Sequence, residues 1–178
     1  GLTGMIDPPR EGVREAVQSF RRAGVNTVMI TGDHVDTALA IARELSIADV
    51  RSQCMTGDEI AVLSEGEWED RVEEIRVFAR VSPEHKVRIV EALRKKGRIV
   101  AMTGDGINDA PSLKAADVGI AMGKEGTDVA RNAADMVLTD DNFTTIEKAM
   151  REGRGIYENI RKTILFLLSS NFGEIMTM

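Results

Sequence analysis

The chain has 178 residues, about the size of one domain, and 43% of them are hydrophobic and 29% charged. Its net charge of −6 argues against a nucleic acid as the main partner. The single cysteine, Cys54, excludes an internal disulfide framework. The two histidines, His34 and His85, have no partner at the spacing of zinc ligands, which argues against a zinc site.

Strand-like apolar runs alternate with helical patterns through residues 1–143, which we treat as one domain. The predicted strands are residues 2–6, 25–30, 51–55, 75–81, 99–102, 118–122 and 136–138. Helices are predicted around residues 13–20, 38–45, 83–93 and 127–132, and the polar segment 64–74, with the single tryptophan, is predicted to be exposed. Repeated βα units with short connections predict an α/β fold with a Rossmann-like, three-layer, mostly parallel sheet.

The tripeptide Thr-Gly-Asp occurs three times, at residues 31–33, 56–58 and 103–105. The first and last copies follow clear apolar strands, so both are expected at the carboxyl edge of the sheet, in one shared crevice. In the middle copy the strand is weaker, and Thr56 with Glu59 three residues later forms a capping-box pattern. We therefore interpret the middle copy as a helix start only.

The last copy carries the strongest chemical signal. Gly104 and Gly106 allow a sharp turn, and Asn108 or Asp109 followed by Ala-Pro favours the start of a helix. Asp105 and Asp109 lie four residues apart, so both could face one point at the sheet edge. Carboxylate oxygens there suit Mg²⁺, which usually takes one or two protein carboxylates plus phosphate and water. The alternative is a turn with a capping aspartate and solvated carboxylates.

Residues 144–178 contain no proline and are predicted to form one long helix, a second region of the chain. Basic residues precede an apolar run at 164–178, which at 15 residues is shorter than the roughly 20 of a membrane span. A basic flank of this kind indicates the cytoplasmic side of a membrane. The alternative, a core helix of a soluble protein, would bury Asn171 and Glu174, so we expect a truncated transmembrane helix.

Five segments together resemble the phosphorylation domain of P-type cation-transporting ATPases, in the haloacid dehalogenase-like superfamily. They are MIDPPR (5–10), MITGD (29–33), ARVSPEHK (79–86), TGDGINDAP (103–111) and SSNFGE (169–174), in the order of that family. The fourth segment is close to diagnostic, and the fifth resembles the fifth transmembrane helix of calcium pumps.

The resemblance implies a phosphoryl-transfer site that uses Mg²⁺ and ATP. Asp105 would bind Mg²⁺ beside an aspartyl phosphate, Thr31 would donate a hydrogen bond to a phosphoryl oxygen, and Lys86 would neutralise phosphoryl charge. Asn108 would contact the phosphate, and Asp109 would support the metal site from behind. Catalysis of this kind depends mainly on positioning and electrostatics.

The resemblance also implies binding residues outside this centre. Gly32, Asp33, Gly104 and Gly106 would shape the phosphate loops, and Asp7 and Arg10 would form a hinge and an ATP contact. Asn171 and Glu174 would bind the transported cation, with Ca²⁺ as the expected ion and Mn²⁺ as the alternative.

One departure from the family pattern is decisive. The chain contains neither Asp-Lys-Thr-Gly-Thr, which carries the family's nucleophile, nor an Asp-x-Asp-x-Thr motif. We therefore expect a fragment of an ATP-driven calcium pump that is inactive alone and whose sheet has a gap or an exposed edge. Its expected partners are the nucleophile strand, the nucleotide-binding domain and transmembrane helices of the parent, in a lipid membrane. The alternatives are a free-standing phosphatase of the superfamily and a non-catalytic phosphate-binding or docking module.

Overall fold

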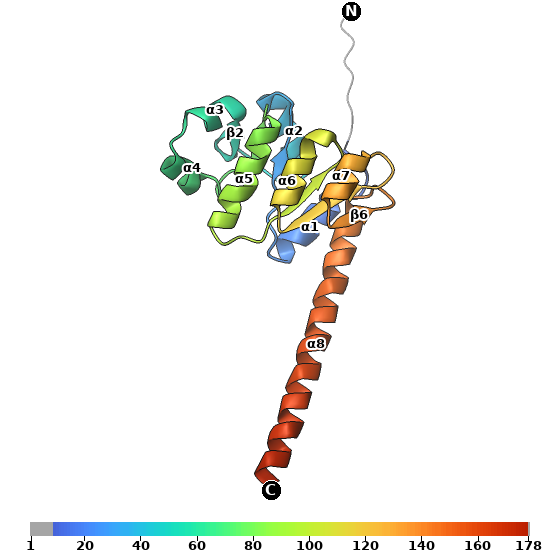
Figure 1. Ribbon diagram of the computed structural model, residues 1–178. Coiled ribbons are helices and arrows are strands. Elements are labelled where there is room, and N and C mark those ends of the chain that lie inside the picture. Colours follow the sequence, from blue (N-terminus) through green and yellow to red (C-terminus); the bar gives the residue numbers. More distant parts are fainter. Residues whose placement is uncertain (1–8, 178) are drawn as a thin grey trace, which may run out of the picture.

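The computed structural model describes residues 9–177, and the side chains of residues 9–172. Within this part of the chain, the strands are β1 (Met29–Ile30), β2 (Cys54–Thr56), β3 (Val77–Ala79), β4 (Ala101–Gly104), β5 (Val118–Met122) and β6 (Met136–Leu138). They form two three-stranded sheets, ordered β1-β3-β2 and β4-β5-β6, and all strand pairings within each sheet are parallel. The predicted α/β class with parallel strands is confirmed (Figure 1).

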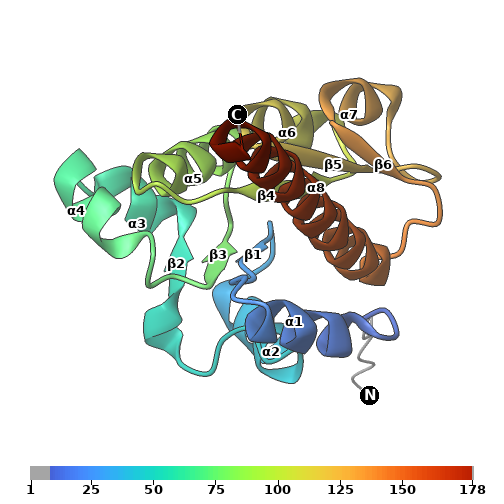
Figure 2. The same ribbon diagram turned by 90° about the horizontal axis from the view of Figure 1, so that it is seen from below.

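Helices cover both faces of the sheets. They are α1 (Val13–Arg22), α2 (Val35–Glu44), α3 (Gly57–Val62), α4 (Glu65–Arg71), α5 (Pro83–Lys95), α6 (Ala110–Ala115), α7 (Asp128–Ala133) and α8 (Thr144–Thr177), with 3₁₀ turns η1 (Arg51–Gln53) and η2 (Ile107–Asp109). Figure 2 shows α5, α6 and α7 side by side along one face, with α1 and α2 on the opposite side. The result is a three-layer arrangement, in which short loops after the strands lead directly into helices.

The two sheets share a core although no ladder joins them in the described residues. β1 pairs with β3 and β4 pairs with β5, so within residues 9–177 each of these two strands has one unpaired edge. Ile30 of β1 nevertheless packs against the cluster that contains Met102 and Leu113. The expected interruption of the sheet is therefore confirmed, and it lies between β1 and β4.

Several strands are shorter than the apolar runs that predicted them. The run 99–102 gives a strand that begins only at Ala101, where pairing with Val118 starts, and Ile99 is 84% exposed. The runs 25–30 and 75–81 likewise give ladders only at β1 and β3. With partners on one side only, β1 and β4 have fewer ladder contacts to extend them. The predicted strand 2–6 lies outside the described residues.

The prediction that segment 64–74 is exposed was wrong for its apolar side chains. Trp68 and Val72 are each 1% exposed, and the Trp68 ring packs edge-to-face on Phe78 at 5.9 Å between centroids. The two residues are four positions apart, which places both on the same side as α4 runs into the following turn. Many surrounding charges hid a short amphipathic helix that closes the core beside β3.

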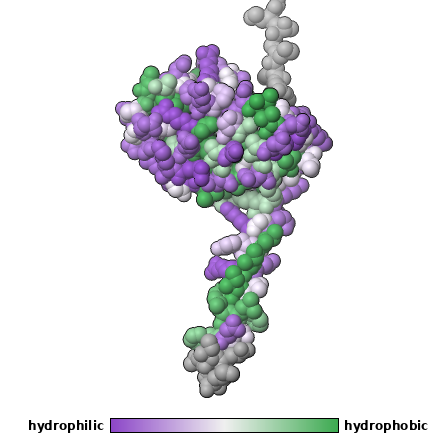
Figure 3. Space-filling view, viewed as in Figure 1, coloured by the Kyte–Doolittle hydropathy of each residue, from purple (hydrophilic) through white to green (hydrophobic). Residues whose placement is uncertain are grey.

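The long C-terminal helix is confirmed as α8, of 34 residues. Its start is fixed to the domain, since Glu147 accepts a hydrogen bond from Ser19 of α1 and Phe143 packs edge-to-face on Phe20. From residue 151 to 172 its side chains are exposed, and Figure 3 shows a band of hydrophobic surface along this stretch. Over the described part of the chain, no helix combines the length and the apolar character that crossing a membrane requires.

Candidate functional site

The loop after β4 is organised by the carboxylate of Asp109, whose side chain is 10% exposed. Its Oδ1 accepts a hydrogen bond from Lys86 Nζ at 2.6 Å. Its Oδ2 accepts hydrogen bonds from the backbone N–H groups of Asp105 at 3.2 Å and Gly106 at 3.1 Å. Both oxygens are engaged, so Asp109 fixes the course of the loop that carries Asp105.

These contacts also determine the charge state of Asp109. Burial by itself would raise the pKa of this carboxyl, because a charge is disfavoured away from water. The hydrogen bonds from Lys86 and from the Gly106 and Asp105 amides, together with the Lys86 charge, outweigh burial and hold the pKa of Asp109 below its ordinary value. Asp109 is therefore ionised at neutral pH and forms a largely buried ion pair.

Gly104 is required by the close approach of Asp109 to the strand end. A Cβ atom at Gly104 would lie 2.4 Å from Asp109 Cβ and 2.8 Å from its Cγ. Gly32, in the first Thr-Gly-Asp copy, has no atom within 4 Å of the same position. The glycine after β4 is thus a packing requirement, whereas the glycine after β1 lies in open space.

Asp105 differs from Asp109 in being exposed, and no ion pair of its carboxylate is formed among the described residues. The Asp109 carboxylate is instead occupied by Lys86 and by the backbone amides of Asp105 and Gly106. No cluster of three or more His, Cys, Asp or Glu side chains able to hold a metal occurs in the described residues. An accessible carboxylate on a rigid loop still fits Mg²⁺, which needs only one or two from the protein.

The loop after β1 is stabilised by its own side-chain contacts and by backbone hydrogen bonds to β3 and the turn after it. The Thr31 hydroxyl donates to Asp33 Oδ2 at 2.9 Å and accepts from the Asp33 N–H at 3.1 Å. The backbone of this loop is tied to the end of β3, since Arg80 N–H donates to Asp33 O and Val81 N–H to Thr31 O. Thr31 is therefore held at the carboxyl end of the first sheet.

Lys86 connects the two sheets at this edge. Ser82 caps α5 and Pro83 begins it immediately after β3, which places Lys86 in the first turn of the helix. From there its ammonium reaches Asp109, which follows β4. The carboxyl ends of β3 and β4 thus lie at the same edge of the molecule, on either side of the interruption.

Two of the other predicted site residues occupy the periphery of this edge. Asn108 is exposed on η2. Arg10 donates to the backbone oxygen of Asp141 at 2.6 Å and forms an ion pair with Glu125 at 2.5 Å. No contact described here joins Arg10 to the Lys86–Asp109 pair.

The remaining predicted residues lie elsewhere. Asn171 is exposed and lies in the last two turns of α8, a helix that runs away from the sheets in Figure 1. Asp7 lies outside the described residues, as does the side chain of Glu174. The prediction that α8 binds the transported cation therefore rests on the sequence alone.

Sequence reasoning missed Asp141, which fixes the loop after β5. It is 4% exposed, has φ of +53°, and accepts hydrogen bonds from the N–H groups of Gly123, Lys124 and Glu125. These hydrogen bonds, first that from Lys124, lower the pKa of Asp141. The adjacent Asp140-Asp141-Asn142 triplet, typical of turns, was the available signal.

The parallel α/β fold agrees with the comparison with known protein families. The chain belongs to the haloacid dehalogenase-like hydrolase family, whose model matches residues 1–117. Within that family, its whole length is similar to one segment of P-type calcium-transporting ATPases. It is 63% identical over 178 residues to Calcium-transporting ATPase 1 of Bacillus cereus and 57% identical to the Calcium-transporting ATPase of Bacillus subtilis.

A human relative and a solved structure extend this similarity. Calcium-transporting ATPase type 2C member 2 of Homo sapiens is 51% identical over 175 residues, which cover 98% of this chain and 18% of that protein. The catalytic domain of the CPx-ATPase CopB-B, solved in work on nucleotide binding, superposes with a TM-score of 0.60 at 29% identity, covering 79% of this chain and 45% of that one. The chain spans about 20% of the length of the bacterial relatives.

Proposed function

We propose that this chain is the phosphorylation-domain part of an ATP-driven calcium pump that works through an aspartyl phosphate. The observation that carries the proposal is the Lys86–Asp109 pair, which joins the two sheets behind an exposed Asp105. The 63% identity to a calcium-transporting ATPase supports the class of parent protein.

The residues at this edge have distinct tasks in the proposed site. Asp105 would hold Mg²⁺, and the bound ion would neutralise charge on the phosphoryl oxygens. Lys86 uses one of its three N–H donors on Asp109, so the others remain available for a phosphoryl oxygen. Rotation of the Thr31 hydroxyl away from Asp33 would allow it to donate to the same group.

The interruption between β1 and β4 supports a specific place for the acceptor. A strand inserted there would pair with both free edges and end between the loops that carry Thr31 and Asp105. A nucleophilic aspartate at the end of that strand would face both loops. In this proposal an earlier segment of the parent pump supplies that strand, and further segments supply the nucleotide-binding domain.

A chimera tests this function directly. We expect that the 178 residues, exchanged for the matching segment of the Bacillus cereus relative, support formation of an acid-stable phosphoenzyme from labelled ATP. Lys86→Met in the chimera should abolish that product, because the transferring group then loses the positive charge that Lys86 contributes beside Mg²⁺. Lys96→Met is the matched control, since Lys96 pairs with exposed Asp70 away from the site. A folded Lys86→Met chimera with full phosphorylation would refute the proposed site.

The chain alone should behave differently from the chimera. Without the acceptor aspartate it should form no acid-stable phosphoenzyme and hydrolyse no ATP. The measurement is phosphorylation by labelled ATP in a preparation free of contaminating ATPase. Incorporation of label into this chain would contradict the assignment of the nucleophile to another segment.

Calcium is proposed as the transported ion because of Asn171 and Glu174. They are three positions apart on a helix, so they share a face, and both offer hard oxygen donors that suit Ca²⁺. A carboxylate within an apolar segment is costly and marks a functional site by default. We propose that residues 164–178 begin a membrane helix of the parent and that the basic side faces the cytoplasm.

Glu174→Gln in the chimera separates ion binding from phosphoryl transfer. Calcium-dependent phosphorylation by ATP should fall, while calcium-free phosphorylation by inorganic phosphate, which uses only the carboxyl-edge site, should persist. Lys162→Gln, a change of charge on the same helix before the apolar run, is the control. Unchanged calcium activation in the Glu174 variant would remove the basis for the calcium assignment.

A further inference from the structure

The middle Thr-Gly-Asp copy has a packing role that the proposed site does not use. Thr56 pairs with Ala79 at the end of β2, and Gly57 is the first residue of α3. A Cβ atom at Gly57 would lie 2.5 Å from the carbonyl oxygen of Arg80 and 2.9 Å from His85 Nδ1. Gly57 is therefore in contact with both ends of the turn that joins β3 to α5.

That turn is tightly constrained on its own side. Arg80 has φ of +50°, in the left-handed region that bulky side chains rarely adopt. The Ser82 N–H donates to His85 Nδ1 at 3.2 Å, and the His85 N–H donates back to Ser82 Oγ at 3.4 Å. The ring of His85 thus caps α5 while it packs against Gly57, so a displacement of α3 is transmitted to the first turn of α5.

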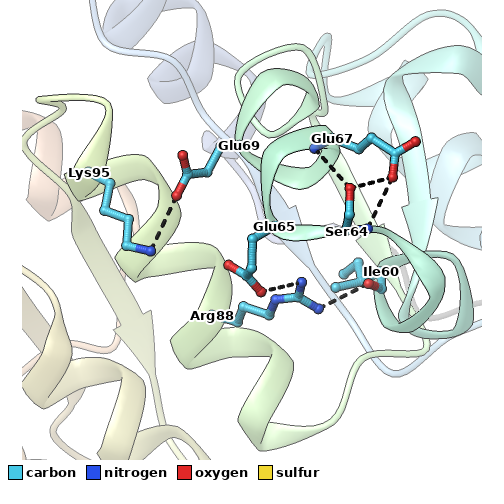
Figure 4. A network of polar contacts seen from close by, with 7 residues as sticks. All are labelled: Ile60, Ser64, Glu65, Glu67, Glu69, Arg88 and Lys95. Atoms are coloured by element: carbon cyan, nitrogen blue, oxygen red, sulfur yellow. Dashed lines mark hydrogen bonds and ion pairs between the residues drawn. The ribbon is translucent and has the colours of Figure 1, made fainter.

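A second contact joins α3 to α5 one turn further on. Arg88 donates to the carbonyl oxygen of Ile60 at 3.0 Å and pairs with Glu65 at 2.8 Å (Figure 4). Arg88 also lies over the Trp68 ring, at 5.6 Å from its centroid. α3 and α4 therefore hold α5 on one side, while Lys86 reaches Asp109 on the other.

We propose that Gly57 is a positioning residue for Lys86. Its missing side chain lets α3 approach the β3–α5 turn, and this approach sets the start of α5 so that Lys86 Nζ meets Asp109. The catalytic meaning of that placement rests on the proposed function, whereas the placement itself concerns only the Lys86–Asp109 pair. A side chain at Gly57 displaces the Arg80 carbonyl, which belongs to the backbone and has no rotamer to yield.

The ammonium group of Lys86 provides a direct readout in the 178-residue chain. Ammonium protons held in a tight ion pair exchange slowly enough to give a nitrogen–proton NMR signal. The signal of Lys86 is assigned as the one that is missing from the spectrum of the Lys86→Arg variant. We expect Gly57→Ala to lose this signal at one fixed, near-neutral pH while the far-ultraviolet circular dichroism is retained. An unchanged Lys86 signal in folded Gly57→Ala would overturn the proposal.

Two controls separate positioning from general destabilisation. Gly66→Ala makes the same change in α4, where no atom lies within 4 Å of the added Cβ, and should keep the signal. Ile60→Val removes one methylene from a fully buried side chain of α3, which destabilises the fold without touching Gly57, and should also keep the signal. Loss of the signal in Ile60→Val would show that any destabilisation breaks the pair, and would overturn the proposal.

A second variant covers the case in which Gly57→Ala does not fold. His85→Ala removes the ring between Gly57 and Ser82 without adding a clash, and should also weaken the Lys86 signal; full retention would overturn the proposal. In the chimera, Gly57→Ala should lower the rate of phosphoenzyme formation while ATP affinity is retained, and Gly66→Ala should change neither. If Lys86→Met leaves phosphorylation intact, the proposed function fails, yet the NMR result still decides whether Gly57 positions Lys86.

Discussion

The copies of Thr-Gly-Asp at residues 103–105 and 56–58 have the same sequence and opposite environments. After β4, Gly104 packs against Asp109, and Asp105 stands exposed on a loop fixed by that carboxylate. After β2, Gly57 packs against the β3–α5 turn and the tripeptide leads into α3 without any loop. Both glycines are sterically required, but of these two copies only the one at residues 103–105 presents a carboxylate at the edge where the two sheets meet.

The difference lies in the residues that follow each tripeptide. Glu59 accepts the N–H of Thr56 at 2.6 Å and closes a capping box, so the helix begins at once. Gly106 and Asp109 instead hold the chain in a turn before α6 begins. The tripeptide alone therefore does not determine the local structure. That structure depends on the side chain, Glu59 or Asp109, that accepts the backbone hydrogen bonds three or four residues later.

The largest expected effect on stability comes from breaking the Lys86–Asp109 pair. Lys86→Met leaves a carboxylate that is 10% exposed without its charge partner, at a cost of about 3 kcal/mol. Lys96→Met removes an exposed pair with Asp70 and should change the free energy of unfolding by about 0.5 kcal/mol or less. Urea unfolding of the chain measures both, and equal losses would mean that the pair does not organise the site.

The next largest effect on stability is expected from substitution of Gly104, compared with Gly32 at the equivalent position after β1. Gly104→Ala places a Cβ against Asp109 and should cost about 2 kcal/mol through overpacking. Gly32→Ala, where the added atom meets nothing within 4 Å, should leave stability within about 0.5 kcal/mol. Thermal unfolding of the two variants side by side is the measurement. A larger loss at Gly32 than at Gly104 would reverse the interpretation of which loop is packed.

A smaller effect is expected from the capping box of the middle copy. Thr56→Ala removes the acceptor of the Glu59 N–H and should cost about 1 kcal/mol. Because this change leaves Gly57 in place, the Lys86 ammonium NMR signal should be retained. If the signal disappears with the cap, the capping of α3 rather than the close approach of Gly57 controls Lys86.

The pH dependence of the Lys86→Met effect should be the smallest change. Because the pKa of Asp109 is lowered in the folded state, its contribution is fully present above the unfolded value of about 4 and is lost as pH falls through the folded value. The difference in free energy of unfolding between the chain and Lys86→Met should therefore shrink below about pH 4. A difference that stays constant, or grows, on acidification would contradict an ionised pair.

Sequence patterns predicted the order of elements and the long helix well, because apolar periodicity and the Pro83 and Thr56 caps are local signals. They failed for Trp68, where burial depends on packing of α4 against Phe78 across the fold. The predicted strands were also longer than the observed ones, since the lengths of β1 and β4 depend on which neighbouring strands pair with them.

The contacts within the candidate site could not be predicted from the sequence. Sequence spacing placed Asp105 and Asp109 near one another but did not reveal that Lys86 and two backbone amides occupy the Asp109 carboxylate. Lys86 lies 23 positions before Asp109, so no local pattern could pair them. The packing role of Gly57 likewise requires the β3–α5 turn to be in place.

The comparison of the two copies yields the most direct test of the central claim. In the chimera with the Bacillus cereus relative, Asp105→Asn and Asp58→Asn are made singly, and phosphoenzyme formed from labelled ATP is measured at matched protein amounts. We expect a loss of about two orders of magnitude for Asp105→Asn, which removes the exposed carboxylate proposed to hold Mg²⁺, and near-normal phosphorylation for Asp58→Asn. Equal losses in the two variants, or full phosphorylation with Asp105→Asn, would contradict it.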